Sequence, residues 1–149
     1  MRNYMEKAIE EAKIALSEQE IPIGCVIVHD GNVIASAHNT KQNSNNSLNH
    51  AEMLALNKAM EVLNTKYLYD CTMYLTIEPC AMCAGAMINC RLGKLVFGAR
   101  EPKTGCAVSN YNLLNDSRFN HRVDVEEGIL EEECSNIMKE FFIIRRNKC

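Results

Sequence analysis

The chain has 149 residues, of which 47% are hydrophobic, and it carries a formal net charge of -3. This length is typical of one domain, and the apolar fraction is sufficient for one continuous core. The acidic balance gives no global electrostatic case for binding nucleic acid, so any such site must be local. Residues 1–7 hold no apolar stretch of signal-peptide type, and no run of about eighteen apolar residues follows. We therefore predict a single domain over residues 1–149 that is soluble, cytoplasmic and independent of membranes.

The eight cysteines of the chain do not indicate a disulfide framework. Such a framework needs an oxidising compartment, and the sequence shows no route to one. Cys25, Cys71 and Cys134 fall within apolar periodic segments, where a thiol behaves as a small hydrophobic group. We expect most thiols to be reduced and buried, and Cys80 and Cys83 to have a separate role.

The chain is predicted to begin with an amphipathic helix and a β-hairpin. Apolar residues recur every three or four positions over residues 2–18, which predicts a helix that ends before Pro22. Segments 24–28 and 33–37 are rich in β-forming residues, and the Asp-Gly pair at 30–31 predicts a tight turn between them.

A polar loop and a second helix are expected next. Residues 39–49 are almost wholly polar and rich in turn formers, which predicts an exposed loop. Apolar side chains return to helical spacing over residues 50–63, and Ser47 or Asn49 can cap this helix. The helix therefore begins at the triplet His50-Ala51-Glu52.

The second half of the chain is predicted to complete an α/β fold. Residues 71–77 are β-rich, and Pro79 suits the first position of a helix over residues 80–90. The remaining expected elements are a strand at 94–98, a helical turn at 112–114, a strand at 123–126 and a closing helix that ends at Arg145-Arg146. Strands interleaved with helices predict a three-layer α/β/α sandwich around a mixed five-stranded sheet.

Three residues have the identity and spacing of a catalytic zinc site. Zinc prefers nitrogen and sulfur ligands, and a catalytic site takes three from the protein while water fills the fourth position. Cys80 and Cys83 lie on one face of a helix's first turn, where free N–H groups and the helix dipole favour thiolates. His50 completes the set, whereas Cys90 lies two turns further along and is too far away. We predict that these three residues bind one Zn²⁺ per chain.

Glu52, two residues after His50, is the predicted general base. Two thiolates and a neutral histidine cancel the charge of Zn²⁺, so a nearby base must help to deprotonate water. His-Ala-Glu upstream and Pro-Cys-Ala-Met-Cys downstream, each at a predicted helix start, are far rarer together than a lone Cys-x-x-Cys. A structural zinc site would usually need a fourth protein ligand and has no use for Glu52.

Beyond the metal motif, essentially the whole chain resembles the bacterial tRNA-specific adenosine deaminases, within the cytidine deaminase-like superfamily. The residues that carry this resemblance are 21–24, Asn39, 50–52, 76–87, 96–100, 103–105, 120–123, 141–142 and 145–146. The resemblance therefore draws on segments along the chain and does not depend on one motif.

The resemblance implies hydrolytic deamination of adenosine to inosine at the wobble position of a tRNA anticodon. Glu52 would carry a proton to N1 of adenine and then to the departing amine. The implied partners are the anticodon stem-loop, expected from an arginine tRNA, and a second copy of the chain in a homodimer. The residues implied to contact the substrate are Asn39, Glu101, Lys103, Asn120, Phe142 and Arg146. Glu101 departs from the family, which commonly has Asp at this position, and reaches about one methylene further.

Two alternative functions stay open at this point. A small-molecule deaminase acting on guanine, cytosine or a nucleoside would use the same metal and the same glutamate. The basic end of the closing helix and the loop of Lys103 favour a polyanionic substrate, whereas a free-base enzyme would need a closed apolar lid. A non-catalytic zinc-binding module is the second alternative, but it would gain nothing from a buried carboxylate beside the metal.

Overall fold

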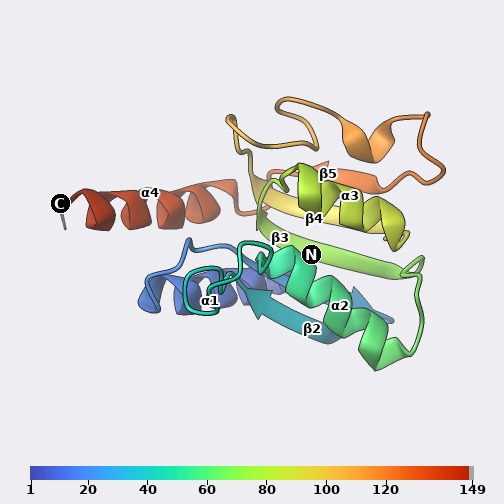
Figure 1. Ribbon diagram of the computed structural model, residues 1–149, viewed down its shortest axis with the longest axis horizontal. Coiled ribbons are helices and arrows are strands. Elements are labelled where there is room, and N and C mark those ends of the chain that lie inside the picture. Colours follow the sequence, from blue (N-terminus) through green and yellow to red (C-terminus); the bar gives the residue numbers. More distant parts are fainter. Residues whose placement is uncertain (148–149) are drawn as a thin grey trace.

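A computed structural model describes residues 1–147, which form a five-stranded sheet between two layers of helices (Figure 1). The helices are α1 (Arg2–Ser17), α2 (Ala51–Leu63), α3 (Ala81–Asn89), α4 (Glu131–Asn147) and the short 3-10 turn η1 (Leu113–Asn115). The strands are β1 (Gly24–His29), β2 (Asn32–His38), β3 (Cys71–Ile77), β4 (Lys94–Ala99) and β5 (Asp124–Glu127). The predicted three-layer sandwich with a mixed sheet is confirmed.

The sheet has the strand order β2-β1-β3-β4-β5. Strand β1 is antiparallel to β2 and β3, while β4 is parallel to β3 and β5. The predicted tight turn joins β1 to β2, because Asp30 and Gly31 both have positive φ angles, 50° and 75°. This hairpin lies at one side of the sheet, with β2 as the outermost strand.

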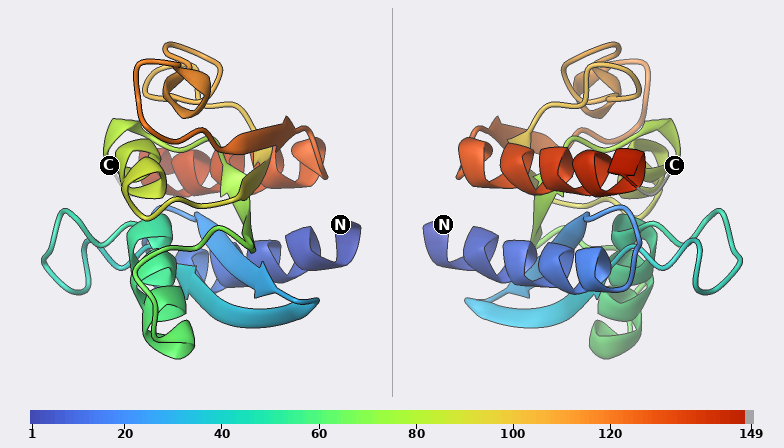
Figure 2. Two further views of the ribbon diagram at one scale, coloured as in Figure 1. Left: turned by 90° about the vertical axis from the view of Figure 1, so that its right-hand side faces the viewer. Right: turned by 90° about the vertical axis from the view of Figure 1, so that its left-hand side faces the viewer.

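The two faces of the sheet have separate apolar cores because side chains of a strand alternate between the faces. Val26 and Val96 pack with side chains of α1 and α4. Ile27, Leu75 and Phe97 point to the opposite face and pack with α2 and α3. The two further views show these helix pairs on opposite sides of the sheet (Figure 2). The central strands are therefore buried on both faces, as their apolar sequences indicate.

Strands β3 and β4 are parallel and end at the same edge of the sheet, which we call the carboxyl edge. Strand β1 begins and β2 ends at this same edge, since Cys25 pairs with Leu75 and Gly24 with His38. The segments that leave the sheet here are therefore 39–49, 78–80 and 100–110. The last turns of α4 extend past the body of the molecule at this end (Figure 1).

The cap of α2 differs from the prediction. Neither Ser47 nor Asn49 caps this helix, and His50 is its N-cap residue. The side chain of Asn39 replaces a local cap, because its Oδ1 accepts a hydrogen bond of 2.8 Å from the backbone N–H of Ala51. This cap comes from twelve residues earlier in the chain, so the local sequence that suggested Ser47 or Asn49 did not show it.

The thiols outside the metal motif match the expectation. All seven cysteines within the described residues are free, and Cys25, Cys71 and Cys134 are buried. Lys148, part of the basic tail, and Cys149 lie outside the described residues. Across residues 1–147, none of the helices has the length and apolar character needed to span a membrane.

We predict that Gly24→Ala lowers the free energy of unfolding by about 1–3 kcal/mol, measured by urea denaturation, because overpacked sites must shift their neighbours. A Cβ atom at Gly24 would collide with the backbone of Ala8 and Ala12 in α1. Gly85→Ala in α3 is the matched control, since a Cβ there meets nothing within 4 Å. Alanine also favours a helix over glycine, so this control should be as stable as the parent or more stable. Equal stability of parent and Gly24→Ala would contradict the close packing of α1 on β1.

Candidate active site

The three predicted metal ligands meet at the carboxyl edge. His50 is the N-cap of α2, Cys80 is the N-cap of α3, and Cys83 lies in the first turn of α3. His50 Nδ1 lies 3.7 Å from Cys80 Sγ and 3.6 Å from Cys83 Sγ. Pro79, expected at the first helical position, instead precedes the N-cap residue. As predicted, the N-terminal ends of both helices converge on one point.

The spacing of these ligand atoms fits a tetrahedral zinc ion. Zinc bonds of about 2.3 Å to sulfur and about 2.0 Å to nitrogen, at tetrahedral angles, place the two ligand atoms about 3.5 Å apart. The observed nitrogen–sulfur separations are 3.6 and 3.7 Å, and all three ligand atoms lie within 4.8 Å of one another. The cluster is thus compatible with zinc and leaves a fourth coordination position for a non-protein ligand.

The two thiols of the cluster shift each other's pKa in opposite directions. A hydrogen bond from Cys83 lowers the pKa of Cys80 to about 4, against the effect of burial. The same hydrogen bond and burial raise the pKa of Cys83. A metal that binds both sulfur atoms displaces the protons that these thiols carry.

Glu52 lies in the first turn of α2 and is only 2% exposed. Its carboxyl group interacts with the Cys83 thiol, which places it beside the cluster, and burial raises its pKa to about 7. Among the described residues, Oε1 of this carboxylate has no hydrogen-bond partner. A buried polar atom without a partner is rare in proteins, and here water or substrate can supply one. A cation at the cluster would favour the carboxylate and lower its pKa again.

Asn39 is buried, with 2% exposure, at the start of the loop beside the cluster. Its Oδ1 accepts the Ala51 N–H and so fixes the end of α2 that carries His50 and Glu52. Its Nδ2 group makes no hydrogen bond to any described residue. The structure thus gives Asn39 a positioning role, and leaves its amide nitrogen able to donate to a ligand.

Two predicted substrate contacts lie together on the segment that follows β4. Glu101 is half-buried and accepts a hydrogen bond of 3.0 Å from the backbone N–H of Lys103, whose side chain is exposed. The Glu101 backbone N–H donates to the Glu78 carboxylate, 3.0 Å away. Glu78 immediately precedes the Pro79-Cys80 turn, so this segment is attached directly to the metal-binding turn.

The other predicted contacts are divided between the two edges of the sheet. Phe142 and Arg146 are exposed on the last turns of α4, which extend at the carboxyl edge (Figure 1). Asn120 is exposed beside His121, whose imidazole lies 2.8 Å from the carbonyl oxygen of Leu92. Leu92 precedes β4, so Asn120 is separated from the cluster by the length of this six-residue strand, about 20 Å. The structure therefore does not bring Asn120 to the cluster.

Glu78 is a site-adjacent residue to which the sequence analysis gave no role. It is 2% exposed, and its carboxylate accepts backbone N–H groups from Glu101, Ala107, Val108 and Ser109. Burial opposes ionisation, but hydrogen bonds from Ser109 and these amides lower the pKa of Glu78. A possible signal was its place in the sequence, as an acidic residue directly between a buried strand and a metal-binding turn.

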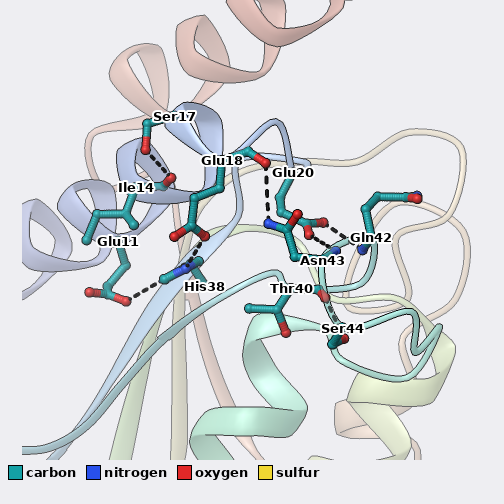
Figure 3. Close-up of polar contacts among 10 residues, drawn as sticks. All are labelled: Glu11, Ile14, Ser17, Glu18, Glu20, His38, Thr40, Gln42, Asn43 and Ser44. Carbon is teal, nitrogen blue, oxygen red and sulfur yellow. Dashed lines mark hydrogen bonds and ion pairs between the residues drawn. The ribbon is translucent and has the colours of Figure 1, made fainter.

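Glu20 is a further buried glutamate, and it holds the loop that follows β2 (Figure 3). Its carboxylate is 1% exposed and accepts the backbone N–H groups of Gln42 at 2.9 Å and Asn43 at 2.6 Å. Next to it, the His38 ring bridges Glu11 at 2.9 Å and Glu18 at 3.0 Å. These contacts tie the residues on both sides of Asn39 to the end of α1.

The fold and the cluster together define a class of protein. The family model described as MafB19-like deaminase matches residues 1–146. The mixed five-stranded sheet with His, Cys and Cys at two converging helix ends is the cytidine deaminase-like fold. The class is therefore that of the deaminases.

Comparison with individual relatives shows to which family of deaminases the chain belongs. The tRNA-specific adenosine deaminase of Bacillus subtilis (strain 168) is 48% identical over 145 residues, which cover 97% of this chain and 90% of that protein. A structure solved in a study of A-to-I editing by tRNA:A34 deaminases is 36% identical, with a TM-score of 0.88 and coverage of 92% of this chain and 99% of that one. A Bacillus subtilis guanine deaminase structure is also 36% identical, but covers 66% of this chain with a TM-score of 0.63. The chain belongs to the tRNA-specific adenosine deaminases.

We predict that His38 makes stability depend on pH. Burial opposes its protonation, but hydrogen bonds to Glu11 and Glu18 outweigh burial and raise the pKa of His38 above its ordinary value of 6.5. Because the folded-state pKa is raised, the stabilisation is fully present below the unfolded pKa and is lost as pH rises through the folded value. Urea denaturation should show that the free energy of unfolding falls more between about pH 6 and about pH 8 for the parent than for His38→Asn. Parallel losses in the two proteins would contradict this assignment.

Proposed function

We propose that this protein converts adenosine to inosine at the wobble position of a tRNA anticodon, with one zinc ion per chain. The observation that carries the proposal is the unpartnered oxygen of Glu52 beside the His50-Cys80-Cys83 cluster. Membership of the tRNA-specific adenosine deaminases supports the substrate. The ligand spacing and donor set support zinc.

His50, Cys80 and Cys83 would hold the ion, which when bound supplies a Lewis acid that makes water easier to deprotonate. Glu52 accepts the proton of the attacking water and delivers it to N1 of adenine as oxygen adds to C6. Glu52 next takes the second proton from the hydroxyl group added at C6 and transfers it to the departing amine, so that water and adenosine give inosine and ammonia. The Glu52 carboxylate can both accept and return a proton, and its Oε1 has no protein partner among the described residues that would compete for this role.

The remaining residues at the carboxyl edge suit the binding of a single-stranded RNA loop. Lys103 and Arg146 offer positive charge, and Phe142 offers an exposed aromatic ring on which a base can stack. Glu101 and the free amide nitrogen of Asn39 would hydrogen-bond the nucleotide. Asn120 can contact only RNA that extends to the far edge of the sheet.

Smaller substrates are less well supported. A guanine deaminase structure that covers 94% of this chain is only 22% identical to it, whereas the tRNA-specific relative that covers 97% is 48% identical. Glu52 is intact and buried beside the cluster, which a non-catalytic zinc module would not need. We therefore retain tRNA as the substrate, with an arginine tRNA as the expected species and the cytoplasm as the expected compartment. Residues 1–149 would act as a single catalytic domain.

We predict that Glu52→Gln keeps zinc and loses inosine formation by at least about a hundredfold, because the amide cannot carry the proton. Cys83→Ala should lose both, because two protein ligands hold zinc poorly. The measurements are zinc per chain by mass spectrometry and inosine in an arginine tRNA anticodon stem-loop. Cys134→Ala, a buried thiol in α4, is the matched control and should keep both. Inosine formation by Glu52→Gln at the parent rate would overturn the mechanism, and a parent with zinc but no inosine would overturn the substrate.

We also propose a homodimer. Large apolar side chains are exposed on the segment between β4 and β5, among them Val108, Tyr111 and Phe119. Exposed apolar side chains of this size provide surface for association. Sedimentation at micromolar protein should give twice the mass of the 16.8 kDa chain. Monomer alone at that concentration would contradict the proposal.

A further inference from the structure

The carboxylate of Glu78 accepts an unusually large number of hydrogen bonds from one loop. Oε1 accepts from the Glu101 N–H at 3.0 Å and from the Ser109 hydroxyl. Oε2 accepts from the N–H groups of Ala107 at 3.1 Å, Val108 at 2.7 Å and Ser109 at 2.8 Å. Five donors from both ends of one segment, residues 101–109, therefore converge on one buried carboxylate.

The segment 101–109 is closed around this carboxylate. A Cβ atom at Gly105 would collide with the Glu78 carboxyl group, so only glycine lets the backbone pass this close to Glu78. The Cys106 N–H donates to the Pro79 carbonyl oxygen at 2.8 Å, which adds a contact beside the metal-binding turn. The Asn110 amide donates to the carbonyl oxygens of Pro102 and Gly105 and closes the segment on itself.

We propose that Glu78 is a positioning residue that holds segment 101–109, and Lys103 on it, in the place where the segment meets RNA at the cluster. This inference rests on the proposed function. Glu78 touches neither the substrate nor the reacting atoms, and it acts through the loop. The same residue leads directly into Pro79 and Cys80, so the metal-binding turn and the RNA-binding segment share one rigid support.

The chemistry of the five donors explains why a carboxylate is needed. An ionised carboxylate only accepts hydrogen bonds and offers about four lone-pair sites, so the five donors use all of its accepting capacity. A glutamine side chain has the same shape, but its NH₂ group would replace one of the two oxygen atoms. That group is itself a donor, so it could not accept the hydrogen bonds made to that oxygen. Glu78→Gln therefore removes part of the anchor with little change in volume, and leaves His50, Cys80 and Cys83 untouched.

The first measurement is amide hydrogen exchange of zinc-loaded protein. Glu78→Gln should raise exchange in residues 101–109 by about tenfold or more, because each lost hydrogen bond opens the segment. Glu20→Gln is the matched control, since Glu20 is an equally buried glutamate that accepts backbone N–H groups of Gln42 and Asn43. This control should raise exchange near residues 42–43 and leave 101–109 protected. Unchanged exchange of 101–109 in Glu78→Gln would overturn the proposal, whether or not the protein is active.

The second measurement separates positioning from general stability. With zinc at one per chain, Glu78→Gln should raise KM for the anticodon stem-loop by about tenfold, a change of about 1.4 kcal/mol. The rise should largely vanish in a Lys103→Ala background, because the anchor then has no lysine to position. If Glu78 were purely structural, the KM increases of Glu78→Gln and Lys103→Ala would multiply in the double variant, and that result would overturn the proposal. A Lys103→Ala variant with the parent's KM would also overturn it.

A milder variant guards against misfolding of Glu78→Gln. Ser109→Ala removes only the hydroxyl donor and should give a smaller rise in both exchange and KM. If Ser109→Ala leaves both values at those of the parent while Glu78→Gln does not fold, the proposal is overturned. A parent that forms no inosine at all would overturn the proposed function, whereas a parent that forms inosine at the same KM as Glu78→Gln would overturn this inference alone.

Discussion

The site depends on one constraint, which is that the N-terminal ends of α2 and α3 meet at the carboxyl edge of the sheet. Each helix end brings free N–H groups and a positive dipole end, and both favour the negative charge of thiolates. Helices α2 and α3 pack on the same face of the sheet, and α3 follows β3, which is parallel to β4. This packing brings His50 Nδ1 within 3.7 Å of the sulfur atoms of both cysteines. Without this convergence, residues thirty apart in the chain could not bind one metal.

Buried glutamates then stabilise the loops around this point. Glu78 and Glu20 each accept backbone N–H groups from a loop that has no regular structure of its own. A loop held by backbone hydrogen bonds to one carboxylate can keep a fixed shape while its side chains point outward. Glu52 is the exception among the three, because its Oε1 has no partner among residues 1–147. Glu78 and Glu20 are thus occupied by loop N–H groups, whereas Oε1 of Glu52 is left without a partner among the described residues.

Local patterns predicted the elements, the sheet and the metal cluster, because periodicity and short motifs are properties of neighbouring residues. The grouping of His50, Cys80 and Cys83 could be predicted because zinc chemistry restricts both the residue type and the spacing of its ligands. The cap of α2 by Asn39 could not be predicted, since its partner lies twelve residues away. The role of Glu78 was missed for the same reason, because its donors lie 23 to 31 residues further along the chain. The distance of Asn120 from the cluster depends on strand direction, which no local pattern specifies.

The most direct test of the account is X-ray absorption spectroscopy at the zinc edge of the zinc-loaded protein. The account predicts two sulfur ligands at about 2.3 Å and two lighter ligands at about 2.0 Å, of which one is His50 and one comes from outside the protein. Three or four sulfur ligands would contradict it, because the zinc would then be a closed structural site with no position for water beside Glu52.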